Sequence, residues 1–329
     1  MRHAVTRRAF LCLFATLPAL LGCGKRTEPQ VAEPPPQWLV VGVSLCKTDG
    51  PWRAQMKTDL EAAADKHSHL RLALMDAQDD AARQRAQLEE FLARRVALVI
   101  VSPKDAQAIT DPVARLFDAG LPVIVLDRAV IGDKYTCLIA ADPKQIGTEA
   151  GKWLAGRLQG KGKIVEIKGP VDSLPAEDLD MAFRAAFRDP GYRFVFDGHV
   201  DPPKVDGGKL MTEALGRIET IDAVFAYDDA AAHSAYLAAQ AAGREKDVLF
   251  VGVGGMPAEG AAYVAQGMLD ATFLYPTGGA EAIDAVAKLL QGRPVPKNIV
   301  PPTRVLAKDS PFRFGDAVGT PSSTIQVKP

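Results

Sequence analysis

Two short polar stretches contain the residues best suited to chemistry in this chain. The stretch DGPWRAQM places Trp52 beside Arg53 directly after a hydrophobic run, and the stretch LDR places Asp127 beside Arg128 in the same context. A guanidinium offers donors in a fixed fork, a carboxylate accepts from hydroxyls, and an indole presents a flat face to polarised C–H groups. These residue types favour the binding of a polyhydroxylated molecule.

Each pair also has a structural interpretation that the residues alone leave open. Trp52 can pack on its own helix while Arg53 stays in solvent. Asp127 and Arg128 can form an ion pair that only holds the turn after the strand. A ligand-binding role and a structural role are therefore both open for these residues.

The positions of these residues are set by a pattern of strands and helices that begins at Trp38. Short apolar, β-branched runs alternate with longer amphipathic runs, which predicts βαβ units and parallel sheets. The alternation starts a second time after the run YTCLIAA, so two α/β lobes are expected. Helices are predicted at residues 52–67, 80–95, 104–119, 143–158, 176–188, 205–217, 230–242, 257–266 and 277–290.

Residues at the carboxyl ends of the strands are expected to form the site, because ligands of open parallel sheets bind there. Trp52, Arg53, Asp127 and Arg128 occupy such positions. Asp228 follows the later run IDAVFAYD. It can make that side of the site more anionic, which suits an amino or cationic ligand, or it can cap the next helix, and the cap is favoured.

Composition and missing motifs exclude several function classes. The chain has 329 residues, 47% hydrophobic and 24% charged, and a formal net charge of -1. It is long enough for two cores and has no basic field for nucleic acid. No nucleophile elbow, phosphate-binding loop or zinc motif occurs, so neither an enzyme, a cofactor nor a metal site is predicted.

The stretch VGVGGMPAEG has closely spaced glycines, but it does not have the dinucleotide spacing G-x-G-x-x-G. A tight turn from strand to helix explains the glycines better, and Pro257 is expected to open that helix. The histidine pair in HSH is expected at the surface rather than on a metal.

The amino terminus reads as an export signal rather than as part of the fold. Basic residues precede a short apolar run that ends in LLGC, so residues 1–23 are predicted to be a lipoprotein signal peptide with Cys23 as the lipidated residue. An ordinary signal peptide with an incidental cysteine is the alternative. Residues 24–37 are a Pro-rich tether. Cys46 and Cys137 can form one disulfide or remain buried thiols.

The doubled plan, the strand-end residues and the anchor resemble the type I periplasmic binding proteins of sugar transporters, of the ribose and galactofuranose kinds. The phrases GPWR, VALVIVSPKDAQAI, LPVIVLDR and IDAVFAYDD carry the resemblance. It implies an α/β fold of two doubly wound parallel-sheet lobes joined by a three-strand hinge. The N-terminal lobe would comprise residues 38–140 plus 276–304, and the C-terminal lobe residues 141–275 plus 305–329.

The resemblance also implies which residues hold the ligand. Trp52 and Arg53, with Asp127 and Arg128, would form one jaw of a sugar clamp. The other jaw departs from the family pattern, so a ligand other than ribose is expected. Residues that differ from the usual sugar-reading groups are Leu179, Pro202, Asp228, Gly254 and Tyr275.

Tyr275 would replace lost contacts by ring stacking and through its hydroxyl. The resulting prediction is a monomeric, membrane-anchored solute-binding protein of the cell envelope. Its partners would be a sugar-like ligand and a membrane permease, or a sensor kinase as the alternative. An enzyme with a similar two-lobe plan would need a nucleophile and a base in the cleft, and the sequence offers neither. A transcription regulator of similar fold is disfavoured by the export signal.

Overall fold

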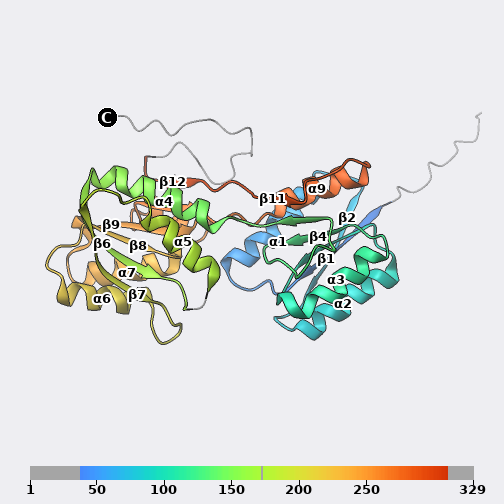
Figure 1. The fold of residues 1–329 in the computed structure, drawn as a ribbon, viewed down its shortest axis with the longest axis horizontal. Helices are drawn as coiled ribbons and strands as arrows, with labels where there is room; N and C mark the ends of the chain where they lie inside the picture. Colours follow the sequence, from blue (N-terminus) through green and yellow to red (C-terminus); the bar gives the residue numbers. More distant parts are fainter. Residues whose placement is uncertain (1–37, 172, 310–329) are drawn as a thin grey trace, which may run out of the picture. The chain divides into compact units, whose positions relative to one another are not determined.

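The computed structural model describes residues 38–171 and 173–309. The predicted signal peptide (1–23), the lipidation site Cys23, the tether (24–37) and residues 310–329 lie outside the described residues. The described chain forms two six-stranded sheets, each covered by helices on both faces (Figure 1).

The first lobe is built on a sheet with strand order β11-β5-β4-β3-β1-β2, and every pairing in it is parallel. Its strands are β1 (Leu39–Leu45), β2 (Leu70–Asp76), β3 (Leu98–Ser102), β4 (Val123–Leu126), β5 (Cys137–Ile139) and β11 (Asn298–Ile299). Its helices are α1 (Pro51–Ala64), α2 (Ala81–Arg94), α3 (Ala106–Asp118) and α9 (Gly279–Leu290).

The second lobe is built on a sheet with strand order β12-β10-β9-β8-β6-β7. All its pairings are parallel except that of β12 with β10, which is antiparallel. Its strands are β6 (Lys161–Lys168), β7 (Gly191–His199), β8 (Ala223–Ala226), β9 (Leu249–Gly254), β10 (Ala271–Leu274) and β12 (Val305–Ala307). Its helices are α4 (Pro143–Leu158), α5 (Leu174–Arg184), α6 (Gly207–Arg217), α7 (Asp229–Ala241), α8 (Gly260–Ala265) and a 3₁₀ turn (Glu245–Asp247).

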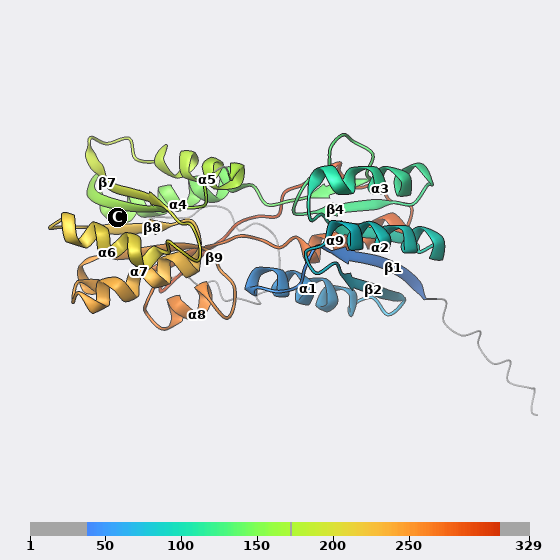
Figure 2. The same cartoon turned by 90° about the horizontal axis from the view of Figure 1, so that it is seen from below.

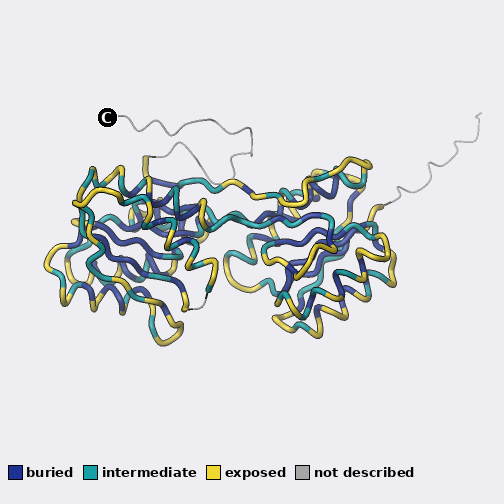
Figure 3. Tube along the Cα trace, in the orientation of Figure 1, coloured by how far each residue is buried: buried dark blue, intermediate teal, exposed yellow. Residues whose placement is uncertain are grey.

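Each sheet is buried on both faces, as its apolar strands require. In the first lobe, α1 and α9 pack on one face and α2 and α3 on the other (Figure 1). In the second lobe, α4 and α5 cover one face and α6 and α7 the other (Figure 2). The strands are the most buried part of each lobe, and the outward helix faces are exposed (Figure 3).

Aspartates at the helix starts explain why the helices begin where the sequence predicts. Asp80, Asp105, Asp142 and Asp206 each accept a hydrogen bond from a backbone N–H of the first helical turn. Such caps satisfy donors that have no partner within the helix, and each contributes about 1 kcal/mol. The largest error at a helix start is that of α8, which begins at Gly260 rather than at Pro257, a residue of the preceding turn. Two helices also end earlier than expected, α1 at Ala64 and α5 at Arg184.

The chain passes between the two sheets three times within the described residues, at 140–142, 275–278 and 300–304. These segments have no regular strand assignment, although the strands on either side belong to different sheets. After the second passage the chain forms α9, whose Ala282 and Ile283 lie in the same core as Met56 and Leu60 of α1.

Candidate functional site

Arg53 and Asp127 form the centre of the polar cluster at the strand ends of the first lobe. The Arg53 Nη2 donates to Asp127 Oδ2 at 3.1 Å, and its Nη1 donates to the Ser102 Oγ at 3.3 Å. The two charged side chains are only 11% and 18% exposed. One guanidinium therefore joins the start of α1 to the ends of β3 and β4.

Asp127 is held by its backbone as well as by Arg53. It has a φ of 72°, in the left-handed region that Asp tolerates better than most residues. Its N–H donates to the Ile139 carbonyl at 2.9 Å. Burial raises the pKa of the Asp127 carboxyl above its ordinary value, and the charges of Arg53 and Arg128 oppose this rise.

Trp52 packs on more than its own helix. Its indole Nε1 donates to the Tyr275 carbonyl at 2.8 Å, and the two rings meet edge to face with centroids 6.0 Å apart. The Arg53 guanidinium carbon lies 5.4 Å from the centroid of the indole. Trp52 is half-buried against the first core, so its edge contacts a chain passage rather than only its own helix.

Arg128 lies apart from the buried pair. Its side chain is exposed, and its Nη1 donates to the Lys104 carbonyl at 2.8 Å. The alternative in which Asp127 pairs with Arg128 is wrong, because the ion pair of Asp127 is made with Arg53. Neighbouring residues at a strand end point in different directions, which favours this outcome.

Buried amides of α2 fix the strand ends that carry this cluster, and the sequence reading missed them. The fully buried Gln84 donates to the Ser102 carbonyl at 2.9 Å and accepts from the Lys104 N–H at 2.8 Å. Gln87 accepts from the Ser44 hydroxyl at 2.8 Å. The sequence signal that could have found Gln84 was its spacing, because it lies four residues before Leu88 on the same face of the helix.

Asp228 in the second lobe is a helix cap, the role favoured from the sequence. Its Oδ1 accepts from the Ala231 N–H at 2.7 Å, at the start of α7. Burial raises the pKa of this carboxyl, while the backbone donors of α7 oppose the rise. One oxygen of Asp228 is thus already engaged by its own lobe.

Asp229 explains the glycines of VGVGGMPAEG. Its side chain is only 2% exposed, and Cβ atoms added at Gly252, Gly254 or Gly260 would lie 2.4, 2.6 or 2.1 Å from its carboxylate oxygens. These distances are shorter than real Cβ atoms tolerate. The prediction of a tight turn rather than a dinucleotide site was incomplete, because the glycines also leave space for a buried carboxylate.

The Asp229 carboxylate has two donors in this space. The Gly255 N–H donates to Oδ2 at 2.6 Å, and the Thr272 hydroxyl donates to Oδ1 at 2.5 Å. Burial nevertheless raises the pKa of Asp229 to about 7, and the charges of Asp228 and Glu259 add to the rise. The second lobe therefore contains a carboxyl group that titrates near neutral pH.

A second ionisable cluster links α5 to β6 and β7. Arg184 donates to Glu166 and Asp197, and Lys168 lies 3.5 Å from Asp180 and 3.3 Å from Asp197. Glu166 is 1% exposed, and burial raises its pKa to about 9, with Asp180 adding to the rise. Lys168, at the end of β6, is thus paired inside its own lobe.

The departures from the resembled pattern have different structural settings. Leu179 is buried between α4 and α5, and a Cβ on Gly147 would lie 2.2 Å from its carbonyl oxygen. Pro202 is exposed after β7. Gly254 borders Asp229, as described above. Leu179 is therefore a packing residue of the second core.

Tyr275 lies in the second passage between the sheets. Its N–H donates to the Gly254 carbonyl at 3.0 Å, while its own carbonyl accepts from Trp52. Burial raises the pKa of its phenol to about 12, and the charges of Asp127 and Asp142 add to the rise. The structure thus brings Tyr275 together with Trp52, Arg53 and Asp127.

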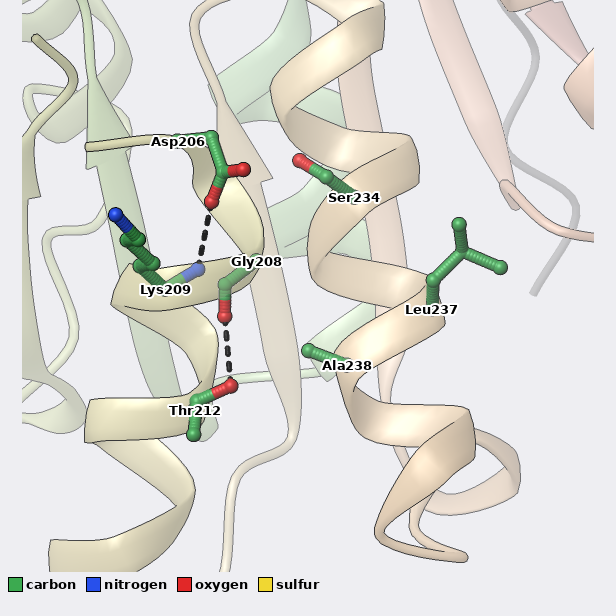
Figure 4. Close-up of a pocket in the computed structure, with 7 residues that line it drawn as sticks. All are labelled: Asp206, Gly208, Lys209, Thr212, Ser234, Leu237 and Ala238. Carbon is green, nitrogen blue, oxygen red and sulfur yellow. Dashed lines mark hydrogen bonds between the residues drawn. The ribbon is translucent and has the colours of Figure 1, made fainter. Parts of the chain in front are cut away.

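Other candidate features lie away from these residues. A groove between α6 and α7 contains none of the predicted site residues (Figure 4); it is lined by Asp206, Gly208, Lys209, Thr212, Ser234, Leu237 and Ala238. Across residues 38–171 and 173–309, no cluster of potential metal ligands occurs and no helix could cross a bilayer. Cys46 and Cys137 are free, buried thiols, which confirms the second alternative for them.

Comparison with known proteins identifies the family. The periplasmic binding protein domain matches residues 41–294. The chain belongs to this family. The predicted resemblance and the fold of two parallel-sheet lobes are thereby confirmed.

Relatives within the family bind sugars or polyols. The ribose import binding protein of Escherichia coli is 28% identical over 257 residues, which are 78% of this chain and 86% of the relative. The fructose-binding periplasmic domain of a hybrid two-component system is 34% identical, covers 82% of this chain and 91% of that one, and has a TM-score of 0.68. A myo-inositol-bound transporter protein from Bacillus halodurans is 27% identical, with coverage of 83% and 95% and a TM-score of 0.69.

Proposed function

We propose that this protein is a periplasmic solute-binding protein that captures a small polyhydroxylated ligand by hinge closure and delivers it to an ABC-type permease. The observation that carries the proposal is the buried Arg53–Asp127 pair at the strand ends of the first lobe. The guanidinium has further N–H groups and the carboxylate further lone pairs, so the pair can donate to and accept from adjacent hydroxyls.

The predicted site residues divide into four roles in this proposal. Arg53 and Asp127 read hydroxyl groups, and the exposed Arg128 donates from the rim. Trp52 presents a face of its indole ring to the ligand. Asp228 and Tyr275 complete the site from the second lobe and the passage between the sheets. Neither an enzymatic step nor a cofactor is part of the proposal.

The ligand class is a sugar or polyol other than ribose. Proteins that bind ribose, fructose and myo-inositol are all similar to this chain, so the fold accommodates monosaccharides and cyclitols alike. Here Leu179 is buried in the core and Gly254 has no side chain. A ligand hydroxyl left unpaired in a buried site costs about 1–3 kcal/mol, which disfavours a ligand that needs groups at those positions.

A sensor function is the second candidate, and one observation favours it. The fructose-binding domain that is 34% identical to this chain belongs to a hybrid two-component system. In that case the closed form would contact a receptor kinase instead of a permease. Both functions use the same site and the same closure, so they differ only in the membrane partner.

The cellular setting completes the proposal. Residues 1–23 direct export, Cys23 carries the lipid, and residues 24–37 separate the anchor from a monomeric binding unit. That unit comprises an N-terminal lobe of residues 38–140 plus 276–304 and a C-terminal lobe of residues 141–275 plus 305–329. Replacing Cys23 by Ser should release the protein from membranes, whereas Cys12→Ser, within the signal, should not. Membrane association that survives Cys23→Ser would refute the anchor.

A thermal-shift screen tests the binding function. The mature protein is melted with monosaccharides, sugar acids, cyclitols, polyols and amino sugars, and at least one should raise the midpoint, because a ligand of the native state stabilises it by RT ln(1 + [L]/Kd). Asp127→Asn should abolish the shift, while Asp80→Asn at the exposed cap of α2 should retain it. A hit that survives Asp127→Asn would place the site elsewhere.

A further inference from the structure

The main chain of Tyr275 is shared between the two lobes. Its N–H donates to Gly254 at the end of β9 in the second lobe, at 3.0 Å. Its carbonyl accepts from the Trp52 indole on α1 in the first lobe, at 2.8 Å. The two hydrogen-bonding groups of one residue are thus bound to different lobes.

Beyond Tyr275 the chain is fixed to the first lobe. The Thr277 hydroxyl donates to Asp59 on α1 at 2.5 Å. Gly279 packs so closely on α1 that an added Cβ would lie 2.9 Å from the Asp59 Cβ and 3.0 Å from the Leu60 nitrogen. The start of α9 therefore has no room to move relative to α1.

Few torsions remain between these two anchored ends. Pro276 has its φ fixed by its ring, and a residue before proline is restricted to extended conformations. The Trp52 bond also fixes the direction of the Tyr275 carbonyl, which restricts its ψ. The φ of Tyr275 is the torsion that separates its bond to Gly254 in the second lobe from its bond to Trp52 in the first.

From this geometry we infer that Tyr275 is the joint of the second passage and that Trp52 is a positioning residue that fixes it. The inference deepens the proposed function, because it assigns to Trp52 a role in closure besides contact with the ligand. Trp52 adjoins Arg53 in the first turn of α1. A ligand that binds Arg53 and Asp127 would therefore order the same helical turn that holds the joint.

The test measures amide hydrogen exchange without ligand, comparing Trp52→Phe with the matched control Trp153→Phe. Phe keeps a ring but removes the indole donor. Trp153, on α4, packs its ring on Phe273 within the second lobe. Loss of the bond should accelerate exchange of the Tyr275 amide, which donates to Gly254, about threefold to tenfold, the range expected for one hydrogen bond.

The expected pattern is local. The Ala140 amide in the first passage, which donates to Ile299, should keep its exchange rate in both variants, and so should the Tyr275 amide in Trp153→Phe. Unchanged exchange of Tyr275 in Trp52→Phe would overturn the inference, as would equal acceleration in all passages.

A second measurement needs no variant and covers the case in which Trp52→Phe does not fold. In the wild-type protein, the indole N–H of Trp52 should exchange more slowly than that of Trp38, which is 44% exposed. Equal rates would contradict the bond. Because neither measurement uses a ligand, failure of the sugar screen would refute the proposed function and leave this result intact.

Discussion

The strand ends of the two lobes use charge in different ways. In the first lobe, Arg53 joins Asp127 across elements far apart in sequence, and both side chains retain some exposure. In the second lobe, Asp228 caps α7 and Asp229 is enclosed by glycines with donors from its own lobe. Lys168 is likewise paired within that lobe.

This difference shows how one architecture supports two kinds of polar group. A charge pair that keeps some exposure at the strand ends leaves donors and acceptors available for a ligand. A carboxylate inside the lobe has its hydrogen-bonding capacity used by Gly255 and Thr272, so it holds strands together instead. We therefore expect substitutions at the strand ends of the first lobe to have the larger effect on ligand affinity. Substitutions around the buried carboxylate of the second lobe should have the larger effect on the free energy of unfolding.

The largest expected effect is that of Asp229→Asn on the pH dependence of the free energy of unfolding. In the unfolded chain Asp229 loses its proton near pH 4, but in the folded protein only near pH 7. Between these two pH values the unfolded state thus binds fewer protons than the folded state. The free energy of unfolding therefore falls as pH rises, by on the order of several kcal/mol. Denaturant unfolding from pH 4 to 8 should show a flatter profile for Asp229→Asn.

The exposed cap provides the control for that experiment. Asp80→Asn should reproduce the wild-type profile, because Asn caps a helix as well as Asp. A profile of Asp229→Asn that coincides with the wild type would show that Asp229 ionises normally in the fold.

The next largest effect concerns the glycines around Asp229. Gly260→Ala places a Cβ 2.1 Å from Asp229 Oδ2, and the overpacking should lower the free energy of unfolding by about 2–3 kcal/mol. Gly156→Ala, in α4, meets no atom within 4 Å and should be neutral or stabilising. Denaturant titration compares the two, and equal effects would contradict the close packing.

Arg53→Met should lower the free energy of unfolding moderately and abolish ligand binding. The change leaves the Asp127 carboxylate buried without its cation, which should destabilise the protein by about 2 kcal/mol. The double variant Arg53→Met with Asp127→Asn should be less destabilised than the sum of the single variants. Additive effects in this cycle would indicate that the pair does not interact in solution.

The smallest expected effect is that of Arg128→Ala. This exposed side chain donates only to a backbone carbonyl, so the free energy of unfolding should change by less than about 0.5 kcal/mol. Ligand affinity measured by calorimetry should still fall if Arg128 binds from the rim. Unchanged affinity would confine the site to the buried pair.

Most of the fold could be predicted because it depends on local patterns. The alternation of apolar runs and amphipathic segments located the strands and helices, and α4 has the predicted bounds of 143–158. Aspartate caps explain the accuracy at helix starts. The start of α8 was misplaced because Pro257 fits both a turn and a helix start, and only packing distinguishes them.

The site was only partly predictable. Strand-end logic selected Trp52, Arg53 and Asp127, and the structure brings them together. It did not select Gln84, because strand-end logic considers only residues that follow strands, whereas Gln84 lies within α2. Nor could it locate the partner of the Trp52 indole, which lies more than two hundred residues further along the chain.

The sequence by itself determined the doubled α/β plan, since periodicity and capping act over a few residues. The tertiary structure decided which charges meet: Asp127 pairs with Arg53 rather than its neighbour Arg128, and Asp229 occupies the space left by three glycines. The physical reason is that hydrogen bonds and ion pairs require distances of about 3 Å, and the arrangement of the sheets alone sets such distances between remote residues.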